Sequence, residues 1–381
     1  MIRPRYLSVF VLGTLLWCGL FLAFTWIIDP YGVSPVRISI KGVNAFKPKR
    51  LDIDRLIKPY EVWRYQPRTV FLGTSRITES IDPRLFENTR FGSAYNAAIP
   101  ASILSENAAH IEQYFQLDKN LRYVFVELFI YNFINPNIEF RTKGFQSLIS
   151  DTVSLNFSGA AVFSSIQTIF LNSLGRPIGP YIAPEGFWVR PKGLSTKKAF
   201  DAQLFTDTIM RIHLEIPEMI IEPTALQALD KIVAVCREHG AELYLIITPS
   251  YPWDDHRLYS LGYWPLLEQW LKTMSKYENV YSFAQYNNII EEPAGADMKY
   301  WNDPIHFSMD TGRLMMEAFL GYENPSRPEN LMRSVTPETV ESVIRERRAG
   351  FEDWDRAHPD FVKMFDQAKF ATKNDRSQRV R

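Results

Sequence analysis

The sequence predicts an α/β protein built on a parallel sheet, preceded by one membrane-spanning helix. Apolar runs of strand length recur along the chain and alternate with segments of helical periodicity, a pattern typical of βαβ units. A run of 23 residues without a charge, at positions 6–28, comes before them. Lys plus Arg and Asp plus Glu each number 43, so no net positive charge favours a nucleic-acid partner.

The first expected element is the helix over 6–28. At 1.5 Å per residue it would be about 34 Å long, which matches the hydrocarbon core of a bilayer. Arg3 and Arg5 precede it and Asp29 follows it, so the positive-inside rule places residues 1–28 as a cytoplasmic stub and anchor, with the body outside. A cleaved signal peptide is the alternative, although no A-x-A-like site follows.

Residues 29–65 are predicted to form a juxtamembrane linker that ends in an amphipathic helix at 51–64. The α/β domain is expected over 66–323. Its first half holds strands near 69–72, 93–96 and 122–129, with a short helix begun by Asp82-Pro83 and a longer one at 102–115. This is a β-α-β-α-β order.

The α/β rhythm resumes after an insert at about 135–222. The sequence predicts helices at 224–239, 265–277 and 309–320, with strands at 242–249 and 280–283 between them. Right-handed crossovers between five such strands give a parallel sheet, for which we expect the order 2-1-3-4-5. The predicted architecture is therefore a flavodoxin-like three-layer sandwich.

The insert and the C-terminal segment break this rhythm. Residues 152–174 lack a charge, but polar residues interrupt them, so an amphipathic helix is expected there rather than a second span. Its expected role is core packing, with a lid or a membrane-surface element as the alternative. Residues 180–193 predict an irregular hairpin. The charged residues 324–381 predict a peripheral helical extension and a disordered tail.

The cysteines and histidines predict neither a metal site nor a cofactor. Cys18 lies in the membrane run and Cys236 in a predicted helix, so the two cannot form a disulfide. The six histidines are scattered without the spacing of zinc ligands. Folding must then depend on the apolar core.

Three residues form a candidate catalytic set. Ser75 follows the strand Thr69-Val-Phe-Leu and the small residues Gly73 and Thr74, at the carboxyl edge where open parallel sheets bind ligands. A serine hydroxyl needs a histidine within hydrogen-bond reach and a carboxylate that orients it. The stretch Asp303-Pro-Ile-His306 offers both. A simple turn at 73–75 is the structural alternative.

These stretches together resemble the SGNH (GDSL-like) hydrolase superfamily. The order of membrane anchor, Gly-Thr-Ser75-Arg and Asp303-Pro-Ile-His306-Phe is similar to that of bacterial envelope proteins related to the alginate O-acetylation proteins and the teichoic-acid D-alanine transfer protein. The resemblance covers roughly 69–130 and 224–320. It implies that Ser75 is the nucleophile, His306 the general base and acid, and Asp303 the residue that orients His306.

The resemblance also implies oxyanion or substrate-binding donors, and here the sequence departs from the family. Thr74 replaces the usual Asp, and Ala101 is the candidate backbone donor where the family has a glycine. Asn96 is a further candidate, while Arg76 is either a donor or a structural ion-pair partner. Glu127 stands where a Gly-x-Asn block is expected.

The function implied by the resemblance is a membrane-anchored, extracytoplasmic serine enzyme that moves or removes an acyl group, most simply acetyl, on an envelope polysaccharide. Transferase and esterase both stay open, because they share an acyl-enzyme. Its expected partners are that polysaccharide and a multi-spanning membrane acyltransferase that donates the acyl group. The alternative is a non-catalytic protein of this fold that binds glycan or serves as a scaffold in a polysaccharide assembly complex.

Overall fold

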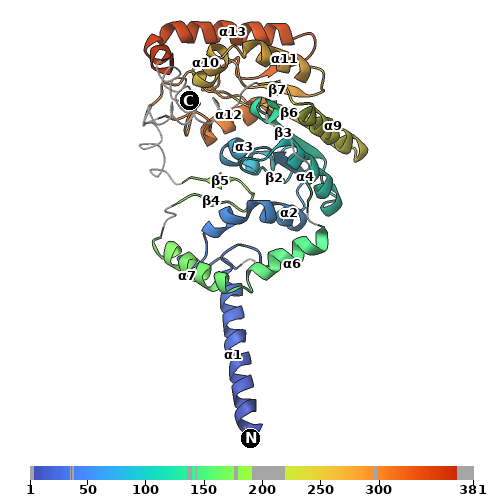
Figure 1. Cartoon of the computed structure of the whole chain (residues 1–381), viewed down its shortest axis with the longest axis vertical. Coiled ribbons are helices and arrows are strands. Elements are labelled where there is room, and N and C mark those ends of the chain that lie inside the picture. Colours follow the sequence, from blue (N-terminus) through green and yellow to red (C-terminus); the bar gives the residue numbers. More distant parts are fainter. Residues whose placement is uncertain are drawn as a thin grey trace, which may run out of the picture.

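The computed structural model describes residues 4–34, 36, 38–134, 140–142, 144–175, 179–190, 219–295 and 298–366. Helix α1 (Pro4–Ile28) projects from the body of the molecule, and its N-terminal end lies far from every other element (Figure 1). Its segment Tyr6–Ile28 is long and apolar enough to cross a membrane. The predicted membrane helix is therefore present as a helix of the required length.

The body is organised around a six-stranded sheet in the order β2-β1-β3-β6-β7-β8. The first five strands of this order pair in parallel, and β8 pairs antiparallel with β7 at one edge. The sheet strands are β1 (Thr69–Leu72), β2 (Ala94–Asn96), β3 (Tyr123–Leu128), β6 (Glu242–Ile247), β7 (Val280–Ser282) and β8 (Arg333–Ser334). The sheet thus has one antiparallel strand more than the five strands expected. This strand, β8, could not be predicted because it is only two residues long and has no apolar pattern.

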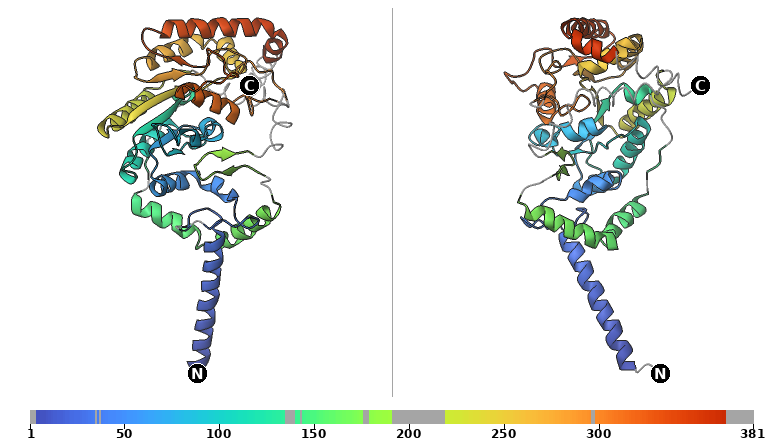
Figure 2. Two further views of the ribbon diagram at one scale, coloured as in Figure 1. Left: turned by 180° about the vertical axis from the view of Figure 1, so that it is seen from behind. Right: turned by 60° about the vertical axis from the view of Figure 1, so that its left-hand side comes forward.

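Helices cover both faces of this sheet. Helices α4 (Leu104–Leu117) and α9 (Pro223–Glu238) pack side by side on one face, while α3 (Ser75–Ser80) and α12 (Met309–Leu320) contact each other on the opposite face (Figure 2). The shorter helices of the domain are η2 (Pro83–Phe86) and α5 (Tyr131–Ile134). Asp82 caps η2 through its side chain, as predicted.

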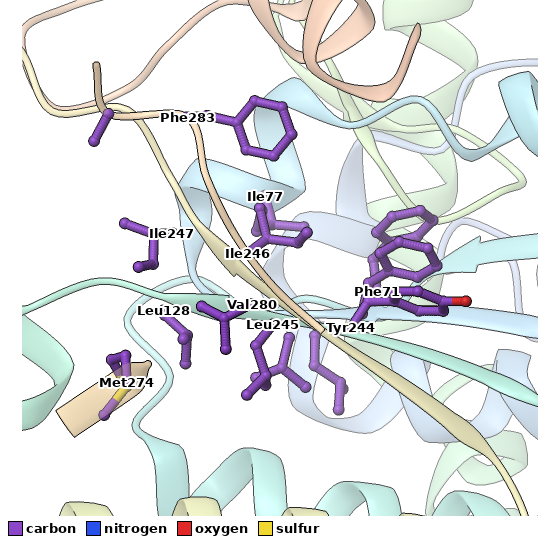
Figure 3. Packing of buried hydrophobic residues seen from close by; sticks show 14 of the residues in the cluster. Phe71, Ile77, Leu128, Tyr244, Leu245, Ile246, Ile247, Met274, Val280 and Phe283 are labelled. Atoms are coloured by element: carbon purple, nitrogen blue, oxygen red, sulfur yellow. The ribbon is translucent and has the colours of Figure 1, made fainter. Parts of the chain in front are cut away.

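Aromatic rings dominate the α12 face of the core. Phe71, Phe125 and Tyr244 occupy matching register positions on three neighbouring strands, and their rings stack at centroid distances of 4.7 and 4.8 Å. Phe319 of α12 closes over Phe125 and Tyr244 edge-on, at 5.1 Å from each. Figure 3 shows Tyr244 and its neighbour Leu245 on opposite sides of their strand, as a strand buried on both faces requires.

The linker and the insert together form a layer between α1 and the sheet (Figure 1). The linker supplies η1 (Pro48–Ile53) and α2 (Asp54–Tyr65). The insert supplies α6 (Phe145–Leu155), α7 (Gly159–Ser173) and the hairpin of β4 (Tyr181–Ile182) and β5 (Trp188–Val189). The single helix expected at 152–174 is two helices bent by 60°. The predicted hairpin is present, and its end beyond residue 190 lies outside the described residues.

The segment after Asn324 is not a peripheral extension. It contributes β8 to the sheet and α13 (Val340–Ala357), which packs on α10 (Pro252–Ser260) and α11 (Trp264–Met274). Phe351 and Trp354 of α13 belong to the main core. Arg347 of α13, 3% exposed, forms a buried ion pair with Asp255. The predicted disordered tail lies outside the described residues.

Candidate active site

A tight turn connects β1 to α3 and places Ser75 at the first helical position. Gly73 has φ +155, and a Cβ there would approach the Glu127 Cβ and the Ile77 Cγ1 to 2.7 Å. No larger residue therefore fits at this position. Thr74 caps α3, because its hydroxyl accepts a hydrogen bond from the Arg76 backbone N–H.

Ser75 is the one residue between positions 69 and 81 whose side chain is not buried. Its Oγ lies 2.8 Å from Nε2 of His306. On the other side of the ring, Nδ1 of His306 lies 2.9 and 2.8 Å from the two carboxylate oxygens of Asp303. The structure thus brings together the three residues that the sequence predicted, across 231 positions of chain between Ser75 and His306.

The backbone of loop 303–306 holds the Asp303 carboxylate in position beside the His306 ring. Oδ1 of Asp303 accepts hydrogen bonds from the backbone N–H groups of Ile305 and His306, at 2.9 and 2.8 Å. An antiparallel bridge between Trp301 and Phe307 closes the loop at its base. An Asx turn of this kind holds aspartate and histidine in one compact unit.

The electrostatics of this unit favour an ionised aspartate. Burial would raise the pKa of Asp303, but the hydrogen bonds and the charge of His306 outweigh it and hold the pKa below the ordinary value of 3.8. An ionised Asp303 accepts a hydrogen bond from Nδ1–H of His306, which keeps the proton on Nδ1 and leaves Nε2 free to accept the Ser75 hydroxyl proton. This is the tautomer that a general base requires.

Arg76 is a structural ion-pair partner that joins the two halves of the site. Its side chain is 2% exposed and its Nε donates to Oε1 of Glu127 at 3.0 Å. Its Nη1 donates to the carbonyl of Ile305, at 2.7 Å, inside the loop that carries His306. Its Nη2 donates to the Thr248 hydroxyl, at 3.0 Å, and to the Pro249 carbonyl. Of the two roles predicted for Arg76, the structure shows the structural one.

Glu127 is the residue whose role the sequence did not reveal. It sits in β3, 1% exposed, and its Oε2 accepts hydrogen bonds from the backbone N–H and the hydroxyl of Thr74, both at 2.8 Å. Its Oε1 accepts from Arg76 and from the Thr248 hydroxyl. Glu127 therefore holds the turn that presents Ser75. The sequence did contain a signal, because Glu127 is the one carboxylate in the otherwise apolar strand 123–128. A buried carboxylate of this kind requires a cation or hydrogen-bond donors as partners.

Close packing of α3 against α12 gives the site a second connection. A Cβ on Gly312 would lie 1.8 Å from the Ser80 carbonyl oxygen, so only glycine lets the two helices approach this closely. The Ser80 hydroxyl donates to the Phe307 carbonyl, next to His306. Both ends of α3 are thus attached to the segment that carries the histidine.

The two remaining donor candidates lie in different surroundings. The Asn96 side chain is fully buried, and its amide donates to the carbonyls of Ile77 and Ile81, at 2.8 and 2.9 Å. Asn96 therefore positions α3, and its donors are used within the fold. Ala101 is exposed and adopts φ +55. Its turn is held to Gly73, whose carbonyl accepts from the Ser102 hydroxyl at 2.8 Å. A role for the Ala101 N–H in binding an oxyanion stays a prediction.

Acidic residues and histidines near the site do not form an alternative centre. Asp254 and Asp255 lie in α10 and are buried. Burial and the neighbouring Asp255 raise the pKa of Asp254 to about 7. His256 of the same helix contacts Asp355 of α13, with 2.5 Å between Nδ1 and Oδ1. Among the described residues, no group of three or more His, Cys, Asp or Glu side chains could hold a metal ion.

The arrangement has the parts needed for nucleophilic acyl transfer. A partly exposed hydroxyl contacts a ring nitrogen, and a carboxylate fixed by backbone donors holds the other ring nitrogen. No family model matches the chain, and a search of curated protein sequences finds no match to it.

Proposed function

We propose that this chain is a membrane-anchored extracytoplasmic serine enzyme that transfers or hydrolyses acyl groups. The observation that carries the proposal is the continuous set of hydrogen bonds from Ser75 through His306 to Asp303. A plain turn would leave the serine buried or unconnected. Here the serine is partly exposed, while every residue around it from 69 to 81 is buried.

The mechanism follows from the positions of the protons. His306 Nε2 takes the proton of the Ser75 hydroxyl as its oxygen attacks the acyl carbonyl carbon. Collapse of the tetrahedral intermediate breaks the bond to the leaving alcohol, which receives that proton from His306 and leaves an acyl-Ser75 ester. His306 then deprotonates water or a sugar hydroxyl, whose oxygen attacks the ester carbonyl carbon. Collapse of this second intermediate breaks the bond between the acyl carbon and Ser75 Oγ, which takes back the proton from His306, while the acyl group leaves on the water or sugar oxygen.

The proposed substrate is an O-acetylated polysaccharide of the cell envelope, and the resemblance of the sequence motifs to SGNH-type envelope proteins supports it. A five-stranded flavodoxin-like arrangement of the parallel strands is part of the same proposal. A multi-spanning membrane acyltransferase is the proposed acyl donor in the transferase version, because an anchored domain can meet such a protein in the same membrane. The esterase version needs only water.

A fluorophosphonate probe tests the proposal, because it reacts only with an activated serine. We expect the full chain to be labelled and mass spectrometry to place the adduct on Ser75. Ser75→Ala should abolish labelling, and Ser326→Ala, which removes an exposed serine outside the triad, should leave it unchanged. A folded chain that neither reacts with the probe nor cleaves a small acetyl ester would support the glycan-binding or scaffold alternative, which the use of the Asn96 amide within the fold also favours.

The proposed location is the bacterial inner membrane, with the α/β body in the periplasm. Hydrogen bonds between the end of α1 and the body support an anchor that is retained. The Asn44 amide donates to the Ile27 and Ile28 carbonyls, at 2.9 and 3.2 Å, and the Lys47 ammonium donates to the Ile28 carbonyl at 2.7 Å. The C-terminal end of α1 is therefore part of the folded body.

A reporter that is active only outside the cytoplasm, fused after Arg381, should be active in cells. The reason is that Arg3 and Arg5 precede the apolar helix and hold the N-terminus in the cytoplasm. A reporter active only in the cytoplasm should be inactive at the same fusion point. The opposite pair of results would overturn the proposed orientation.

A further inference from the structure

Helix α7 is amphipathic, but its apolar side faces away from the body and its polar side faces the body, which is the reverse of a helix on a water-facing surface. The side chains that it turns toward the body are small or polar: Ala161, Ser164, Ser165, Thr168 and Asn172. The large side chains that it turns outward are apolar, namely Phe163 at 64%, Ile166 at 56%, Phe170 at 62% and Leu174 at 46% exposure. A helix packed on a core in water shows the opposite pattern, with its apolar stripe inside.

The polar inner face is used for specific contacts with the linker, so the orientation of α7 about its axis is fixed. The Asn172 amide donates to the Phe46 carbonyl at 2.9 Å and its oxygen accepts from the Phe46 N–H at 2.8 Å. The Ser164 hydroxyl contacts the Tyr31 hydroxyl at 3.2 Å. If α7 turned its apolar side chains inward, these bonds would break. The backbone groups of Phe46 and the hydroxyl of Tyr31 would then lose their hydrogen-bond partners on α7.

The same helix pair is attached to the end of the membrane helix. The Thr25 hydroxyl of α1 donates to the Asn156 carbonyl, between α6 and α7, at 2.7 Å. The Asn156 amide donates to Asp29 at 3.0 Å, and the rings of Trp26 and Phe157 lie 5.8 Å apart. The exposed apolar face therefore begins where α1 ends, which is where a spanning helix leaves the hydrocarbon core.

Length and direction exclude a second crossing by α7 alone. Its 15 residues extend about 22 Å, less than the roughly 30 Å core of a bilayer. Figures 1 and 2 show α6 and α7 lying crosswise at the base of α1, between it and the rest of the body. Phe145 on α6 and Phe157 at the bend are also exposed, at 47% and 48%. Phe145 is the first residue of α6, and the other exposed residues of that helix are polar (Gln146, Ser147, Ser150 and Ser154), so the apolar face covers α7 and the bend before it.

We propose that the outward face of α7, with Phe157 at the bend before it, lies in the interfacial layer of the bilayer that α1 crosses, with Phe163, Ile166 and Phe170 among the acyl chains. The occupant of this face is lipid, because the face is continuous with a helix whose own surface requires lipid. The body would then be held by α1 and α7 together and could not swing on α1 alone. Exposed large apolar groups in this number are otherwise unusual on a water-facing surface.

Depth measurements on the full chain in lipid vesicles test this inference. Nitroxide labels would be attached to Phe163→Cys, Ile166→Cys or Phe170→Cys, one at a time, in a chain carrying Cys18→Ser and Cys236→Ala. Tyr259→Cys, on α10 and 53% exposed, is the matched control in the body. These positions are exposed, so the labels should preserve the fold, which an unchanged thermal transition would verify.

The measured quantity is the ratio of collisions with oxygen, which concentrates in the bilayer, to collisions with a water-soluble nickel chelate. We expect this ratio to be several-fold higher at each of the three α7 positions than at position 259. Equal ratios at all four positions would overturn the inference. Labels shielded from both reagents in pure lipid would show packing against protein and also overturn it. So would labels that reach the chelate in pure lipid but are protected in native membranes, because a partner protein would then cover the face.

Discussion

Replacing His306 with alanine is expected to lower the rate of acyl transfer by roughly a million-fold, close to the loss from Ser75→Ala. Without the ring, no group accepts the Ser75 proton, and the hydroxyl reverts to a weak nucleophile. Residues that act as one unit show such losses individually, so Ser75→Ala combined with His306→Ala should cost little more than either change. The measurement is the rate of hydrolysis of an activated acetyl ester, together with fluorophosphonate labelling.

Two variants serve as controls for this result. Asp303→Asn keeps the shape of the loop but stabilises the wrong tautomer of His306, and we expect a loss of about ten-thousand-fold. His239→Ala removes a ring that stacks on Phe115 and should leave the rate unchanged. A His306→Ala protein that keeps a tenth of the original rate would show that another group is the base.

Replacing Glu127 with alanine is expected to destabilise the fold by about 3–5 kcal/mol, because Arg76 would remain buried without a counter-charge. Burial already lowers the pKa of Arg76, and the charge of Glu127 opposes that effect. The change also removes the acceptor of the Thr74 N–H. Urea unfolding of the full chain in detergent micelles, followed by circular dichroism, measures the loss.

The exposed ion pair of Arg84 with Asp82 provides the contrast. Arg84→Ala should cost at most about 1 kcal/mol, because water screens such pairs. A double variant, Arg76→Met with Glu127→Met, should lose less than the two single variants combined, since it leaves no unpaired charge. A Glu127→Ala protein as stable as the original would mean that Arg76 finds another partner or that water enters.

The proximity of the three candidate catalytic residues could be predicted from the sequence because each member has a distinctive residue type in a distinctive place. Ser75 follows a strand and two small residues, and Asp303 and His306 share one short loop. The buried residues that hold these three in place could not be predicted in the same way. Glu127 and Arg76 meet because β3 lies beside β1, so their pairing depends on the sheet register rather than on local sequence.

The C-terminal segment shows the opposite limitation. Its charged composition suggested a peripheral extension, but the charged residues of α13 are exposed apart from Arg347 and Asp355. Its apolar residues Val343, Ile344, Phe351 and Trp354 lie in the core. The helical spacing of those four residues in the sequence indicates such packing, whereas the composition does not. The uncharged run 152–174 includes only the end of α6 together with all of α7, and the bend falls within it just before Ser158, which caps α7.

The position of α13 in the core has a consequence for how the protein is made. Ribosomes deliver chains from the N-terminus at about 5–20 residues per second, so under the proposed topology α1 would enter the membrane well before α13 is synthesised. The buried pair of Arg347 with Asp255 joins parts separated by 92 positions. Until the last fifty or so residues have been translocated, Asp255 lacks its counter-charge and β7 lacks its edge neighbour. Under that topology the nascent body would remain tethered and incomplete at the membrane surface, where proteases or chaperones could reach it.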